Sequence, residues 1–216
     1  MEFRFNDEVT VQAKDVLLQG ELIVPLHANA VIIFSHGSGS SRLSSRNKMV
    51  ARYLNEKKFG TLLFDLLTPA EEKIYDKRFD IALLTERLIN ATKWIEKHPA
   101  VKQCSLGYFG ASTGAAATLN AAAALPQIAA VVSRGGRPDL AMEQLSKVEA
   151  AVLLIVGSYD FEVIKLNHTA FKQLHCEREL EIVHGASHLF EEAGTMEKVC
   201  ELAAGWFEKH LQPITV

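Results

Sequence analysis

The sequence predicts an α/β fold in which a mostly parallel sheet is flanked by helices, and two observations carry this prediction. Short unbroken apolar runs recur along the chain, and such runs are typical of strands that are covered on both faces. The segments between them place apolar residues at helical spacing, as do Ile81, Leu84, Leu88, Ala91 and Ile95. Alternating strands and helices favour a parallel sheet joined by right-handed crossovers.

The predicted strands follow one another in a regular order. Residues 4–11 and 16–24 alternate β-branched and aromatic residues with polar ones, and Lys14 and Asp15 separate them. We expect these two strands to form an antiparallel edge. The buried strands are then predicted at 31–34, 61–64, 104–109, 129–132, 152–156 and 179–183.

Composition indicates an ordinary globular protein, and we expect a single domain over residues 1–216. The chain is 48% hydrophobic and 23% charged, with a formal net charge of −3, so no basic field favours a nucleic-acid partner. Its 3 cysteines lack metal-ligand spacing and suit a reducing compartment. The N-terminus carries no signal or transit pattern and no apolar run reaches membrane-spanning length, so we expect a cytoplasmic protein without a membrane partner.

Polar residues that follow the apolar runs are the first candidates for function. In a sheet of this type, ligands bind beyond the carboxyl ends of the strands. The residues in these positions are His36, Asp65, Ser112, Ser133, Asp160 and His188.

A nucleophile elbow is predicted at residues 110–114, which read Gly-Ala-Ser-Thr-Gly. The motif follows an apolar strand and precedes an alanine-rich helical stretch that ends at Pro126, which is the context that such an elbow requires. The strained turn exposes the serine oxygen, and the flanking glycines avoid collisions with the strand and the helix. Ser112 is therefore the candidate nucleophile, and the alternative is a serine that only caps the helix.

Serine needs a general base, and His188 is the histidine that we expect to act. It lies in the loop after the last predicted strand, so that Ser, Asp and His follow in the order typical of α/β-hydrolases. His184 lies four residues earlier, but Gly185 stands where a zinc motif of this spacing needs glutamate, so no metal site is predicted. The remaining candidates fall on turns or in the terminal helix: His27, His98 and His210.

The acid that orients the base is predicted to be Asp160. It comes directly after the strand at 152–156, which places a carboxylate at the same sheet edge. Asp65 and Asp139 also follow strands and remain alternatives, either of which could instead serve a turn or a cap.

An oxyanion hole is expected from two backbone N–H groups. The loop at 35–41 is rich in glycine and serine, and Ser38 is the predicted donor from this loop. The N–H of Thr113, directly after the nucleophile, is the second predicted donor. His36 is a candidate for contacting substrate, or else a structural residue.

On these residues the chain resembles the dienelactone hydrolase family of α/β-hydrolases. The likeness spans nearly the whole chain and rests on His36 and Gly37, the elbow at 110–114, Asp160, and the stretch at 185–190. It implies an eight-stranded, mostly parallel sheet, hydrolysis of small esters or lactones through an acyl-enzyme, and no metal or organic cofactor. Dienelactone hydrolases carry cysteine at the elbow, so with Ser112 the chain resembles a serine carboxylesterase.

Two further expectations concern the substrate. Many lipases insert a helical lid after the strand that corresponds to 129–132, but the short segment 134–149 cannot hold one, so we expect an open site. Four arginines are expected near the carboxyl edge and could hold a substrate carboxylate or phosphate, or be structural: Arg42, Arg46, Arg134 and Arg137. Of these, Arg42 and Arg134 are the candidates for substrate binding.

The sequence thus predicts a serine hydrolase with Ser112, His188 and Asp160 as its catalytic residues and a small acyl compound as its substrate. A thioesterase, a peptidase or an acyltransferase could use the same residues. A ligand-binding protein that keeps the fold without turnover is the alternative from another class. The oligomeric state has no signal in the sequence.

Overall fold

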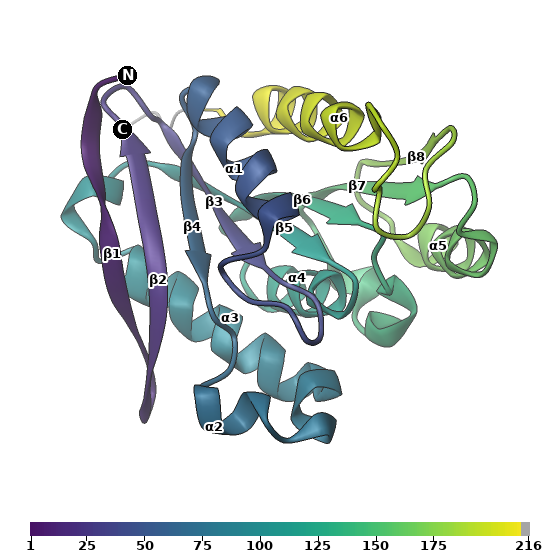
Figure 1. Cartoon of the computed structure of the whole chain (residues 1–216), viewed down its shortest axis with the longest axis horizontal. Helices are drawn as coiled ribbons and strands as arrows, with labels where there is room; N and C mark the ends of the chain where they lie inside the picture. Colours follow the sequence, from purple (N-terminus) through teal and green to yellow (C-terminus); the bar gives the residue numbers. More distant parts are fainter. Residues whose placement is uncertain (213–216) are drawn as a thin grey trace.

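The computed structural model describes residues 1–212 and contains one eight-stranded sheet (Figure 1). The strand order is β1-β2-β4-β3-β5-β6-β7-β8, in which β1 and β2 pair antiparallel, β2 and β4 pair antiparallel, and all later pairs are parallel. The strands span Phe3–Ala13 (β1), Val16–Pro25 (β2), Ala30–Ser35 (β3), Gly60–Phe64 (β4), Ser105–Ala111 (β5), Ile128–Arg134 (β6), Ala151–Gly157 (β7) and Arg178–Val183 (β8).

Helices cover both faces of the sheet (Figure 1). Helices α1 and α6 contact each other on one face, and α3 and α4 contact each other on the other face, where α5 also packs. The helices span Ser45–Glu56 (α1), Pro69–Glu72 (α2), Ile81–Ile95 (α3), Thr113–Ala124 (α4), Phe161–Gln173 (α5) and Thr195–His210 (α6). No helix among residues 1–212 combines the length and the apolar character that a membrane crossing needs.

The inner parallel strands β3 to β7 are largely apolar because both of their faces are buried, whereas the edge strand β8 carries charged and partly exposed residues. In β3, Val31 and Ile33 join the core under α3 and α4, while Ile32 and Phe34 join the core under α1 and α6. Successive side chains of a strand point to opposite faces, so every position of such a strand meets a hydrophobic layer. This explains why unbroken apolar runs predicted the strands of the sheet.

The predicted fold class is confirmed, with strand ends that differ from the prediction by a few residues. The antiparallel edge turns at Lys14, whose φ is 52°. The segment after β6 holds only two short 3-10 turns, Pro138–Ala141 and Leu145–Lys147, and the first packs against α4 and α5. The expectation that no lid domain is present is therefore confirmed.

The chain order creates a crevice at the carboxyl ends of β3 and β5. From β3 the chain crosses through α1 to β4 on one side, and then returns through α3 to β5 on the other side. The loops that leave β3 and β5 therefore diverge, which is the topological switch point where α/β proteins bind ligands. The elbow lies at the end of β5, on one side of this crevice.

Helix α4 lies very close to the strands that it covers. A Cβ atom built at Gly110 would be 2.5 Å from the Cα of Ala115 and 2.8 Å from the hydroxyl of Thr118. The small residues of α4 are buried, as are Ala115, Ala116 and Ala117. Only glycine at the end of β5 allows this approach, so the alanine-rich helix and the elbow glycine belong to one packing arrangement.

We expect Gly110→Ala to lower the free energy of unfolding by about 1 to 3 kcal/mol, because the new methyl group overlaps backbone atoms of α4 that cannot move independently. Gly205→Ala is the control, since Gly205 is exposed within α6 and its added Cβ meets nothing within 4 Å. That substitution should raise stability by about 1 kcal/mol through helix propensity. Chemical denaturation measures both, and equal effects would contradict the packing argument.

Candidate active site

Ser112 sits on a strained turn between β5 and α4. Its φ of 50° and ψ of −122° lie outside the regions that ordinary residues adopt, and it is one of five non-glycine residues with positive φ among those described. Its N–H donates to the carbonyl of Arg134 at 3.3 Å, and its own carbonyl accepts from the N–H of Arg137 at 3.1 Å. Hydrogen bonds from both backbone groups of Ser112 thus hold the turn in place. Backbone strain of this kind is common at active sites.

The loop after β3 packs directly on this turn through two glycines. A Cβ at Gly114 would be 2.3 Å from the carbonyl oxygen of Ser35 and 2.4 Å from that of His36. A Cβ at Gly37 would be 3.1 Å from the Cβ of Ser112. The glycine-rich loop therefore reaches the nucleophile candidate only because neither glycine carries a side chain.

His188 and Asp160 form a hydrogen bond at the ends of the last two strands of the sheet. Asp160 follows β7 and His188 follows β8, and the distance from Nδ1 of His188 to Oδ2 of Asp160 is 2.5 Å. The Asp160 side chain is 14% exposed and the His188 side chain is 41% exposed. A carboxylate in this position accepts the proton of Nδ1, which leaves Nε2 as the free nitrogen that a base needs.

The loops that carry these two residues are bonded to each other. The N–H of Tyr159 donates to the carbonyl of Ala186 at 3.0 Å, and the N–H of Gly185 donates to the hydroxyl of Ser158 at 2.9 Å. A Cβ at Gly157 would lie 2.4 Å from the Ala186 carbonyl oxygen. The backbone therefore fixes the separation of acid and base.

Ser112 and His188 line the same pocket, which has a volume of about 200 Å³. Loops after β3, β5, β6 and β8 and the first turn of α1 enclose it. Sequence reasoning missed three of its residues: Ser44, which caps α1, Asn47 in α1, and Gly135 after β6. Asn47 carried no signal, whereas Gly135, with φ of 52°, stands next to a strand end and close to the His188 ring.

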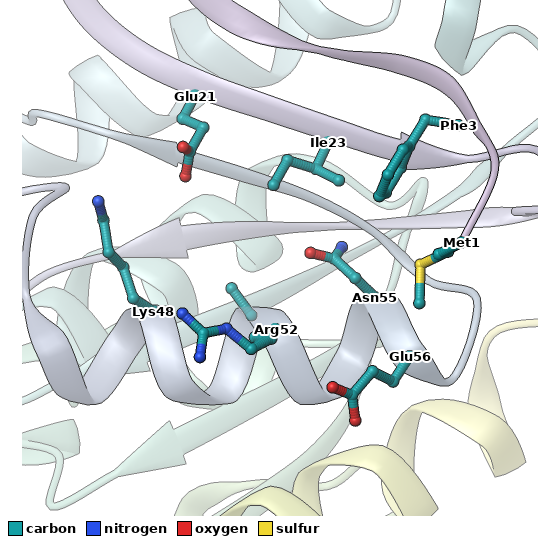
Figure 2. Close-up of a pocket in the computed structure, with 9 residues that line it drawn as sticks. Met1, Phe3, Glu21, Ile23, Lys48, Arg52, Asn55 and Glu56 are labelled. Carbon is teal, nitrogen blue, oxygen red and sulfur yellow. The ribbon is translucent and has the colours of Figure 1, made fainter.

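A larger pocket of about 300 Å³ lies elsewhere, between α1 and the edge strands (Figure 2). In Figure 2, Lys48 and Arg52 of α1 face Glu21 and Ile23 of β2. No histidine, serine or cysteine is among its lining residues in the described part of the chain. The arrangement of reactive groups, and not the size of the cavity, therefore identifies the candidate site.

His36 holds the loop after β3, and its bonds favour the structural alternative over a contact with substrate. The N–H of Leu66 donates to its Nε2 at 3.0 Å, so its Nδ1–H donates to the carbonyl of Gly37 at 2.9 Å. The residue is 5% exposed. Burial lowers the pKa of His36, and the backbone bond to Gly37 and the charges of nearby acids only partly oppose this.

The four loop arginines have different roles. Arg42 donates from its backbone N–H and its guanidinium to Asp65, each at 2.8 Å, which favours a structural role over the predicted substrate binding. Arg137 makes a bidentate ion pair with Asp139 through two bonds of 2.8 Å. Arg46 and Arg134 instead line the pocket with Ser112.

These ion pairs also distinguish the three acid candidates. Asp65 and Asp139 accept from Arg42 and Arg137, and only Asp160 bonds to a histidine that lines the pocket. His184, the nearest competing base, is exposed at the end of β8. Within residues 1–212, no group of three His, Cys, Asp or Glu side chains is arranged to hold a metal ion.

The two predicted oxyanion donors lie side by side. The N–H of Ser38 donates to the hydroxyl of Thr113 at 2.9 Å, so this N–H already has an acceptor in the structure. Thr113 is the first residue of α4 and is 4% exposed.

Comparisons with known proteins find similar sequences and structures over almost the whole chain. A family model described as the dienelactone hydrolase family matches residues 25–211. A crystal structure of a dienelactone hydrolase from Anabaena variabilis is 47% identical, with a TM-score of 0.94, and the match covers 98% of this chain and 100% of that one. Est1E from Butyrivibrio proteoclasticus matches with a TM-score of 0.80 at 15% identity, over 94% of this chain and 98% of that one, which shows the shared fold.

Curated relatives from two strains of Mycobacterium tuberculosis carry a different name. Each is 50% identical over 207 residues, which is 95% of this chain, and each is provisionally named a phosphoribosyl transferase. The match covers 47% of each relative, so the chain spans about half of their length.

We expect protein stability to fall as the pH drops below about 6.5, in part because of His36. The unfolded chain binds a proton near the ordinary histidine pKa of 6.5, whereas burial lowers the folded pKa, so acid favours the unfolded state. His36→Gln removes this titration and should lose less stability than the wild type between about pH 8 and pH 5. Urea denaturation at both pH values measures this, and identical losses would mean that His36 does not contribute.

Proposed function

Because the chain belongs to the dienelactone hydrolase family, we propose that it is a serine hydrolase that cleaves small carboxylic esters or lactones. Ser112 is the proposed nucleophile, His188 the base and Asp160 the carboxylate that orients the base. The observation that carries the proposal is the 2.5 Å bond between His188 and Asp160 on the rim of the pocket that also exposes the strained Ser112.

In the proposed mechanism the Ser112 oxygen attacks the substrate carbonyl carbon while Nε2 of His188 removes the hydroxyl proton. The resulting tetrahedral intermediate collapses, the bond to the leaving oxygen breaks, and the imidazolium returns its proton to that oxygen. Water then enters, loses a proton to His188 and releases the acid from Ser112. Asp160 remains ionised and stabilises the imidazolium in both half-reactions.

The negative charge of the intermediate needs donors that are already in place. The N–H of Thr113 stands at the start of α4, where the helix dipole also favours a negative charge. The N–H of Ser38 contributes when it is shared with the Thr113 hydroxyl, which lies 2.9 Å from it. In hydrolases, removal of one such donor raises the activation free energy by about 3 kcal/mol.

The cysteines do not provide an alternative nucleophile. The side chains of Cys104 and Cys200 are buried, and none of the three cysteines lines the pocket that contains Ser112. Burial raises the pKa of Cys200 to about 11, and it also raises the pKa values of Cys104 and Cys176. At neutral pH these thiols hold their protons and are poor nucleophiles.

The pocket favours a small substrate. Its volume of about 200 Å³ is below the range typical of drug-sized ligands, and polar residues make up most of its lining. The name of the Mycobacterium tuberculosis relatives applies to proteins about twice as long, and we propose hydrolysis for the half that this chain represents.

The experiment that tests the proposal compares the wild type with Ser112→Ala. We expect a fluorophosphonate probe to label Ser112 alone, with the adduct located by peptide mass spectrometry, and Ser112→Ala to abolish ester turnover while the protein still unfolds cooperatively. Turnover that survives the substitution would exclude the mechanism. A folded wild type that takes no label would instead support a ligand-binding role.

We expect Asp160→Asn to lower kcat for a small ester by about four orders of magnitude, because the imidazole loses its orienting carboxylate and favours the wrong tautomer. Asp139→Asn is the matched control, since Asp139 pairs with Arg137 at the same sheet edge. Steady-state kinetics should show kcat of the control within a few-fold of the wild type.

A matched panel of esters, thioesters and amides then separates an esterase from a thioesterase or a peptidase.

A further inference from the structure

A buried arginine without an anionic partner lies beside the candidate nucleophile. Arg134 is the last residue of β6 and pairs with Ala111 in the sheet, directly before Ser112. Its backbone carbonyl accepts the N–H of Ser112 at 3.3 Å. The guanidinium therefore extends from the backbone segment that holds the nucleophile, and it lines the same pocket.

Within residues 1–212, the charge of Arg134 is not balanced. The residue is 6% exposed, its Nη2 is 3.5 Å from Oδ1 of Asn47, and its guanidinium lies 5.8 Å from the Phe190 ring centre. Its Nε is buried without a hydrogen-bond partner. Burial and the neighbouring charge of Arg46 lower the pKa of Arg134 to about 10. A buried guanidinium without a counterion destabilises a fold, so packing alone does not account for it.

Arg46 supplies a second cation to the pocket, from α1. It stands in the first turn of α1, which contains no acidic residue, and its Nε is also buried without a partner. Its only ion pair within the described chain is with Glu191, at 3.5 Å, and the Glu191 side chain is 66% exposed. Such a pair is weak, so most of the positive charge of Arg46 remains available to a ligand.

Neutral donors surround the two guanidinium groups. Ser40, Ser44 and Asn47 line the pocket as well, and the lining contains no aspartate or glutamate among the residues that the structure describes. Ser44 caps α1, so the positive end of this helix dipole faces the same region. The pocket therefore has donors on the α1 side and on the β6 side, with no carboxylate between them.

We propose that Arg134, Arg46 and the first turn of α1 form a binding site for a phosphate group of the substrate. A phosphomonoester carries close to two negative charges at neutral pH, which match two guanidinium groups. The three terminal oxygens of a phosphate point in different directions and can accept from donors on several sides of the pocket. The two oxygens of a carboxylate lie in one plane and can accept from fewer of these donors. The start of a helix is a common place for a phosphate.

The substrate class that follows is a short ester or lactone that carries a phosphate group. Ser112 and the two arginines share a pocket of about 200 Å³, so the carbonyl and the phosphate must be only a few bonds apart. This assignment rests on the proposed function for its reacting group, but the phosphate site itself does not require turnover.

The test therefore measures binding in a protein that lacks the nucleophile. Inorganic phosphate is titrated into Ser112→Ala by calorimetry at constant ionic strength, with acetate as the carboxylate probe. We expect saturable binding of phosphate that is tighter than that of acetate, and a loss of at least about tenfold in affinity when Arg134→Gln is added, because a charge-assisted donor is removed. Arg46→Gln should weaken phosphate binding in the same direction.

Arg137→Gln in the same background is the matched control, because the Arg137 guanidinium is already paired with Asp139. Its phosphate affinity should match that of the parent. Thermal unfolding establishes that each variant is folded, and Arg46→Gln provides an independent test if Arg134→Gln unfolds. Phosphate affinity that is the same in all variants, or tighter binding of acetate than of phosphate, would overturn the proposal. An inactive wild type that still binds phosphate through Arg134 would refute only the hydrolase function.

Discussion

The close approach of α4 to β3 and β5 is the constraint on which the rest of the site depends. A Cβ at Gly114 would lie 2.3 Å from a carbonyl of the loop after β3, and one at Gly110 would lie 2.5 Å from the backbone of α4. With both side chains absent, the strand can turn sharply into the helix and hold Ser112 at a φ of 50°. The loop that carries Ser38 then reaches the start of α4 and bonds to Thr113.

The remaining parts of the site are added to this turn by neighbouring strands. β6 brings Arg134 beside the nucleophile, β7 brings Asp160, and β8 brings His188. Because parallel strands end at the same edge, residues far apart in the chain meet there without a dedicated scaffold. The crossed backbone bonds between the last two loops then hold the acid and the base in register.

The distribution of charge in the site separates structural from functional groups. Arg42 and Arg137 meet carboxylates at 2.8 Å, and these pairs stabilise loops around the site. Arg134 is buried and Arg46 is partly buried. Among residues 1–212, the one carboxylate paired with these two cations is the exposed Glu191. The uncompensated charge beside Ser112 is the observation on which the proposed anion site rests.

The sequence alone determined the fold class, the strand order along the chain and the positions of Ser112, Asp160 and His188, because hydrophobic period and the strand-turn-helix motif are local patterns. The roles of His36 and of the four arginines depended on the tertiary structure. Whether His36 bonds to Leu66, or Arg42 to Asp65, depends on which strand ends become neighbours. Nothing local to Arg134 indicates that its guanidinium bonds to Asn47, a residue of α1 that is distant in the sequence. Long-range contacts set the charge balance and hydrogen bonding of each side chain, so these roles follow only from the folded chain.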